Sequence, residues 1–106
     1  MRENAFQRLL IQKIKLRFPG CIVLKNDCNY IQGIPDLTVL WHDRWAVLEC
    51  KQSLNAPHRP NQDYFISRMD TMSFARMICP ENEKEVLDDL ERTFSLARAT
   101  RVPFGE

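Results

Sequence analysis

The 106-residue sequence lacks most of the features by which a protein class is recognised at first sight. Its four cysteines form no CxxC pair and only two histidines are present, so no zinc-finger spacing exists. Glycine occurs three times and hydrophobic residues make up 44% of the chain, a composition that excludes a disordered or low-complexity protein. No run approaches the roughly 20 apolar residues that cross a bilayer, so we expect no membrane partner.

A secretion signal and a dominant charge are missing as well. The N-terminal segment MRENAFQRLLIQKIKLRF is charged throughout, without the apolar core of a signal peptide, so we expect a cytoplasmic protein. In that compartment Cys21, Cys50 and Cys79, each inside an apolar run, are expected to be reduced and buried. The net charge of +1 excludes a histone-like polycation, although residues 1–60 carry nine basic against five acidic side chains, a bias that suits contact with a polyanion.

Apolar periodicity is what the sequence does contain, and it predicts one α/β domain over residues 1–98 with a loose tail at 99–106. The predicted elements are a helix at 3–18, strands at 21–25, 37–41 and 45–51, a helix at 61–72, a strand at 74–79, and a last helix opened by Pro80. We expect Phe65, Met69 and Met72 to form the buried stripe of the middle helix. Helices before and after a few strands imply a small mixed sheet covered by helices.

Three charged residues stand at the ends of the most hydrophobic hairpin, GIPDLTVLWHDRWAVLECK at 33–51. Glu49 and Lys51 are two apart on a strand, so their side chains leave the same face. A two-residue loop at the HDR turn places Asp36 opposite Glu49 or Lys51, depending on which two residues it uses, and on their face. A three-residue loop instead pairs Asp36 with Cys50 on the other face, unless a bulge corrects it. The spacing therefore permits convergence without requiring it.

The three charges together match the parts of a phosphodiester-cleaving site. Two neighbouring carboxylates raise each other's pKa unless a cation sits between them, and oxygen ligands with open positions suit Mg²⁺, or Mn²⁺ as a substitute. Lys51 cannot ligate a metal as an ammonium, but it can contact a phosphate and stabilise developing negative charge. The competing interpretation is a Pro-Asp turn together with a surface Glu-Lys pair at the end of an edge strand.

At this point the residues resemble a known family. Pro35-Asp36 followed by Glu49-Cys50-Lys51 resembles the PD-(D/E)xK nuclease signature, and the element order resembles that superfamily's restriction-endonuclease-like αβββαβ core. The segments GIPDL, LECK and RPNQ are most similar to the VRR-NUC group and its small phage-encoded, Holliday-junction-resolvase-like relatives. The resemblance covers about residues 3–92. It implies a Mg²⁺-dependent nuclease in which Asp36 and Glu49 hold the metal, the carbonyl of Cys50 is a further ligand, and Lys51 is the catalytic lysine.

Two residues outside the motif are weaker candidates for the same site. Glu3 lies at the N-terminal end of the first helix's apolar stripe, and in related nucleases a glutamate on this helix joins the metal site. A first-turn glutamate is also favoured by the helix dipole alone, so both interpretations of Glu3 stay open. By the resemblance, Gln62 lines the site or contacts the scissile strand's phosphate; otherwise it is a solvated residue at a helix start. The Cys50 thiol has no histidine at motif spacing to activate it as a nucleophile.

Residues beside the motif are candidates for DNA contact. His58 and Arg59 stand in a proline-bounded loop where a phosphate contact is reasonable, although an ordinary exposed loop explains them equally well. Asn26 and Tyr30 precede the motif in a loop that could border the cleft. Lys25 extends a basic track, for which solvated surface charge is the competing explanation.

These features predict a structure-selective endodeoxyribonuclease that acts on branched or junction DNA, and the resemblance implies that its cleavage leaves a 5′-phosphate. No recognition helix, zinc module or arginine-rich arm is evident, so selectivity would come from DNA shape. One site cuts one strand, so paired cutting of a junction needs a two-fold homodimer. If the chain is phage-encoded, it would work in the host cytoplasm. The alternatives are a flap or single-strand nuclease, a nickase module of a larger complex, and a catalytically silent nuclease-fold protein that binds nucleic acid or a partner.

Overall fold

The structure is a computed structural model that describes residues 2–100, with side chains described through residue 96. It contains α1 (Glu3–Arg17), β1 (Ile22–Lys25), β2 (Leu37–Trp41), β3 (Arg44–Cys50), α2 (Pro60–Met72), β4 (Phe74–Ile78) and α3 (Glu83–Thr100). The predicted α/β class and element order are confirmed, with element bounds that differ by a few residues. Pro80 lies in the turn before α3 rather than inside it. Of the predicted tail at 99–106, the last six residues lie outside the described part of the chain.

The four strands form one open mixed sheet in the order β1-β2-β3-β4. β1 pairs with β2 and β2 with β3 in antiparallel fashion, whereas β3 and β4 are parallel and connected through α2. In the hairpin, Trp41 lies opposite Arg44, so the loop has two residues and is His42-Asp43. The backbone of His42 turns in the left-handed region, with φ of 55°. Of the alternatives considered, this register is the one that continues to Asp36 opposite Glu49.

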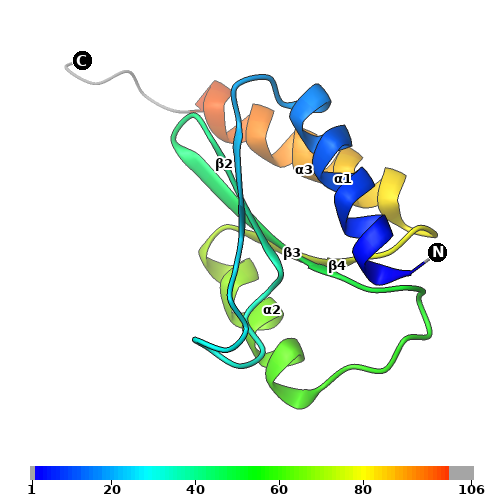
Figure 1. The fold of residues 1–106 in the computed structure, drawn as a ribbon. Helices are drawn as coiled ribbons and strands as arrows, with labels where there is room; N and C mark the ends of the chain where they lie inside the picture. The colour runs from blue at the N-terminus through cyan, green and yellow to red at the C-terminus, as the bar shows by residue number, and fades with distance from the viewer. Residues whose placement is uncertain (1, 101–106) are drawn as a thin grey trace.

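Helices cover both faces of the sheet, but unequally. Figure 1 shows α1 and α3 together on one side of the sheet and α2 on the other. The hydrophobic core lies under the helix pair, where strand residues such as Leu37, Leu48 and Cys50 meet Leu10 of α1 and Leu90 of α3. Successive side chains of a strand point to opposite faces of the sheet. Val47, Glu49 and Lys51 therefore face α2.

The expected buried stripe of α2 is wrong. Nothing in this helix is buried: Phe65 and Met69 are half-buried, and Met72 is 59% exposed. The reason is that α2 lies alone on its face of the sheet, against β3 and β4, so solvent reaches both of its flanks. α1 and α3 shield each other, and a helix in such a pair can bury a complete stripe.

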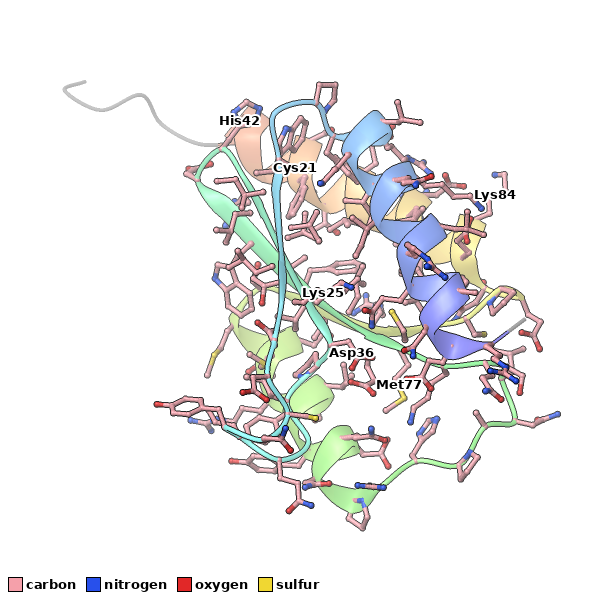
Figure 2. All side chains as sticks on the ribbon, in the orientation of Figure 1. Cys21, Lys25, Asp36, His42, Met77 and Lys84 are labelled. Atoms are coloured by element: carbon pink, nitrogen blue, oxygen red, sulfur yellow. The ribbon has the colours of Figure 1, made fainter. Side chains whose placement is uncertain are left out.

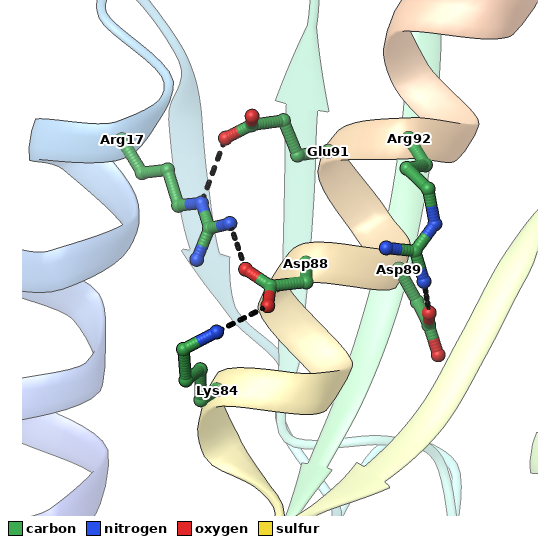
Figure 3. Close-up of polar contacts among 6 residues, drawn as sticks. All are labelled: Arg17, Lys84, Asp88, Asp89, Glu91 and Arg92. Atoms are coloured by element: carbon green, nitrogen blue, oxygen red, sulfur yellow. Dashed lines mark hydrogen bonds and ion pairs between the residues drawn. The ribbon is translucent and has the colours of Figure 1, made fainter.

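Ion pairs join α1 to α3 on the outer surface of this layer. Arg17 donates to Glu91 over 2.8 Å and also to Asp88, which accepts from Lys84 as well (Figure 3). The two cations lower the pKa of Asp88 to about 2. Each such exposed pair contributes little to the free energy of unfolding. We therefore infer that these pairs orient α1 and α3 relative to each other rather than stabilise the fold.

The cysteines are all free, and two of the three expected to be buried are so. Cys50 and Cys79 are buried, whereas Cys21 is only half-buried because it precedes the edge strand β1. Within residues 2–100, no helix combines the length and apolar character needed to cross a membrane.

Candidate active site

The hairpin register brings the three charged residues of the motif together at the end remote from the turn. Asp36 is anchored there because its Oδ2 accepts a hydrogen bond of 2.9 Å from the backbone N–H of Cys50. Glu49 and Lys51 are 3% and 7% exposed, which is unusual for charged side chains. Figure 2 shows Asp36 between α2 and the N-terminal end of α1, whereas His42 lies at the opposite end of the hairpin. The prediction that these charges share one face is therefore confirmed.

Gln62, in the first turn of α2, connects the acid and the amine of the ExK motif. Its Oε1 accepts from the Lys51 ammonium over 2.7 Å, and its Nε2 donates to Glu49 Oε2 over 2.9 Å. The same Oε1 accepts from the backbone N–H of Arg59 over 3.1 Å, which caps the helix start. An ammonium requires an acceptor and a carboxylate requires a donor, so the two charges determine which way the amide points.

Lys51 keeps donor capacity for a further ligand. Besides Gln62, its ammonium donates to the carbonyl of Pro57 over 3.1 Å. Both partners are neutral oxygens, and an ammonium has three N–H groups. The remaining donor and the full positive charge are thus available to an anionic group in the site.

The carboxylates of the site are held in an environment that opposes their ionisation. Burial and then the nearby Asp36 charge raise the pKa of Glu49 to about 7, against the lowering effect of Lys51. The pKa of Asp36 is raised by burial, against the hydrogen bond from Cys50. Burial and then Asp36 raise the pKa of Glu3. The three acids therefore lie within electrostatic reach of one another and of a single lysine.

Two adjoining cavities open over this cluster. One, of about 280 Å³, is lined by Glu3, Cys28, Asn29, Gln32, Gly33, Ile34, Asp36, Glu49, Arg59 and Gln62. The other, of about 360 Å³, is lined by Glu3, Lys51, Pro57, His58, Arg59 and Gln62. Glu3 lines both cavities. The interpretation in which Glu3 joins the acids of the motif therefore agrees with this geometry better than a helix-dipole role alone.

The remaining candidates lie apart from the cavity walls. Lys25 and Tyr30 line neither cavity. Asn26 donates from Nδ2 to the carbonyl of Pro35 and to Thr38, so its amide supports the loop before Asp36. Cys50 has its side chain in the core, and burial raises the pKa of its thiol to about 12, which agrees with the expectation that it is no nucleophile.

No protein-family model, curated protein or solved structure matches the chain. The function must therefore be argued from the residues and geometry of this cluster.

The 27–34 loop before the motif, which the sequence placed beside the cleft, does line the first cavity, but it does so through Cys28, Asn29, Gln32, Gly33 and Ile34 and not through Asn26 or Tyr30. This loop is fixed against α2, because Asn61 Nδ2 donates to the carbonyl of Gln32 over 3.1 Å. Gly33 is what permits the approach: its φ is +90°, and a Cβ there would lie 2.5 Å from Asn61 Cγ. The signal available in the sequence was the glycine two residues before Pro35.

We expect the Gly33→Ala variant to lower both stability and any activity of the site. The left-handed backbone costs a non-glycine residue about 1–2 kcal/mol, and the added methyl group pushes the loop away from α2. Urea denaturation measures the first effect. The Gly20→Ala variant is the matched control, since Gly20 also has positive φ, at 87°, but has no atom within 4 Å of its Cβ position. Equal behaviour of the two variants would refute the role of the Asn61 contact.

The residues present fit a hard divalent cation. Glu49 Oε1 is buried and has no hydrogen-bond partner among the described residues, an expensive arrangement unless a ligand satisfies it. Among residues 2–100, no three Asp, Glu, His or Cys side chains are close enough to form a complete metal site. Mg²⁺ does not require one, because it keeps several waters and is held through one or two carboxylates. Asp36 and Glu49 supply that pair.

The raised pKa of Glu49 makes a prediction about the metal-free protein. The ordinary glutamate pKa of 4.5 rises to about 7 in the fold, so between these pH values the folded state binds more protons than the unfolded chain. The free energy of unfolding therefore falls as pH rises from 4.5 to 7, by roughly 3 kcal/mol at most. We expect urea denaturation in EDTA to show this fall, and the Glu49→Gln variant to lack it.

The exposed Glu85 provides the control, since Glu85→Gln should keep the pH dependence of the wild type. If the free energy of unfolding depends on pH in the same way for the wild type and Glu49→Gln, the fold does not disfavour the ionised form of Glu49.

Proposed function

We propose that this chain is a divalent-metal-dependent endodeoxyribonuclease of the PD-(D/E)xK type, with α1 through β4 as its restriction-endonuclease-like core. The observation that carries the proposal is the convergence of Asp36 with the buried Glu49 and Lys51 in one cluster, with Gln62 bonded to both members of the ExK motif. A turn and a surface ion pair, the competing interpretation, would leave these groups solvated. The VRR-NUC group is the branch that the sequence resembles most.

The proposed metal ligands are Asp36 and Glu49, with the carbonyl of Cys50 as a further candidate; Glu3 lines the same cavity but forms no three-side-chain group with them. When bound, a cation of this kind supplies Lewis acidity toward the phosphate and lowers the pKa of water. It would also neutralise the repulsion that raises the pKa of Glu49.

The protein's own groups act on the phosphate. Lys51 places its free N–H and its charge beside the cavity that Glu49 lines, where it stabilises the additional negative charge of the pentacoordinate transition state. Gln62 keeps the ammonium oriented. His58 and Arg59, on the wall of the second cavity, are placed to contact the neighbouring phosphates of the DNA strand.

We further propose selectivity for branched or junction DNA and action as a homodimer. Among the described residues, the three helices pack against the sheet, which favours recognition of DNA shape over reading of base edges. Residues 2–100 contain one cluster of the Asp36, Glu49 and Lys51 type, so symmetric cutting of two strands requires two copies.

Nicking of supercoiled plasmid tests the chemistry. We expect conversion to the open circle with Mg²⁺ or Mn²⁺ and none in EDTA. A panel of labelled four-way junction, flap and linear duplex then identifies the preferred substrate, with the junction cut fastest. Metal-independent binding without cleavage would instead make the chain a silent nuclease-fold binder, and would refute the proposal.

A further inference from the structure

Tyr30 is exposed to an extent that the fold does not explain. Its side chain is 84% exposed, and it makes no hydrogen bond or ring contact with any residue whose side chain the structure describes. The neighbouring Ile31 is 38% exposed, so the tip of the loop presents two adjacent apolar side chains to solvent. A single exposed apolar residue is ordinary, but a tyrosine next to an exposed isoleucine, in a loop whose flanking residues line a cavity, offers a contact surface.

The loop that carries Tyr30 is held firmly. The backbone N–H groups of Tyr30 and Ile31 donate to the carbonyl of Asp27, and the N–H of Asn29 donates to the Asp27 side chain. Farther along, the N–H of Ile34 donates to the carbonyl of Ile31. Together with the Asn61 contact to Gln32, these bonds hold the backbone that carries the ring, so less backbone entropy is lost when a ligand packs on the loop.

The same loop forms a wall of the acidic cavity. Cys28 and Asn29 precede Tyr30, and Gln32, Gly33 and Ile34 follow Ile31; all five line the cavity with Asp36 and Glu49. A DNA strand with its phosphate in that cavity would run beside the residues that flank Tyr30 and Ile31. We propose that Tyr30 stacks on an unpaired nucleobase next to the scissile phosphate, so that the site selects DNA with bases out of the duplex. This inference rests on the proposed nuclease function and names its substrate class.

A nucleobase fits this surface better than a protein partner. The apolar area is confined to the loop tip, which is small for a stable protein interface. A base offers a flat face of matching size, and stacking on aromatic side chains is a general means of holding unpaired strands. Arg59, which lines both cavities, supplies positive charge for the backbone of the same strand.

Fluorescence anisotropy in EDTA tests the stacking contact without cleavage. Two labelled DNAs of one sequence are compared: a full duplex, and the duplex with unpaired nucleotides in one strand. We expect Tyr30→Ala to weaken binding of the second DNA by about tenfold and so to lower the ratio of the two affinities, while Tyr30→Phe keeps it. Leu16→Ala is the control, since Leu16 is 82% exposed on α1 and lines neither cavity.

Each outcome decides the inference. An unchanged ratio in Tyr30→Ala, or an equal loss on both DNAs, overturns base stacking. If Tyr30→Phe loses as much affinity for the DNA with unpaired nucleotides as Tyr30→Ala does, the effect belongs to the hydroxyl group. Base stacking is then overturned as well. If the wild type nicks plasmid with Mg²⁺ while Tyr30→Ala binds both DNAs normally, only this inference fails. If the wild type neither binds nor cuts any DNA, the proposed function fails with it.

Discussion

The Lys51→Ala and Asp36→Ala variants are expected to lose detectable DNA cleavage while keeping the fold. Lys51 is the cation nearest to three acids whose pKa values depend on it, and its free donor is the group we place at the phosphate. Removing one preorganised charge of this kind costs about a hundredfold to a thousandfold in rate. Asp36 is one of the two proposed carboxylate ligands, so its loss would remove half of the carboxylate contacts of the proposed cation. Plasmid nicking with Mg²⁺ measures both effects.

Because Lys51 is 7% exposed, its truncation also leaves a void, and a second substitution separates charge from packing. Lys51→Met keeps an unbranched apolar stem of similar length, and we expect it to be as inactive as Lys51→Ala but more stable to urea. Lys84→Met is the matched control. The Lys84 side chain is 90% exposed on α3 and pairs with Asp88, far from the cavities (Figures 2 and 3). Wild-type cleavage by both Lys51 variants would show that this lysine is not part of the reaction.

Gln62 is the second residue whose replacement should have a large effect. In Gln62→Ala the buried Glu49 loses the donor to Oε2, Lys51 loses one of two acceptors, and α2 loses its first-turn cap. An unsatisfied buried polar group costs about 1–3 kcal/mol, so we expect cleavage to fall by about ten- to a hundredfold. The cap accounts for about 1 kcal/mol of lost stability, measured by urea denaturation.

Gln62→Glu separates the two roles of the amide. Its carboxylate still accepts from Lys51 and from the Arg59 N–H, so the cap is kept, but the donor to Glu49 becomes a like charge that further raises the pKa of Glu49. We expect cleavage as low as in Gln62→Ala although the cap remains. Gln12→Ala, on the exposed face of α1, is the control. If Gln62→Glu cuts DNA at the wild-type rate, the bond to Glu49 has no part in positioning the site.

The sequence alone determined the elements and the identity of the motif residues. Alternating hydrophobic residues in β2 and β3 predicted the hairpin, and the two-residue spacing of Glu49 and Lys51 determined that they share a face. These inferences are reliable because strand and helix periodicity is a local property of the chain. The same reasoning left the hairpin register open, since the HDR turn allowed loops that differ by one residue, and only the pairing of Trp41 with Arg44 decided it.

Only the tertiary structure decided which distant segments complete the site. The 27–34 loop, Glu3 and Gln62 come from different parts of the chain, and their meeting depends on the close contact of Gly33 with Asn61 and on α2 covering only part of its sheet face. The expected apolar stripe of α2 failed for the same reason: periodicity reports that one side of a helix is more apolar, but burial depends on what packs beside it. Local pattern determines the parts, and long-range packing determines the distances between charged groups on which chemistry depends.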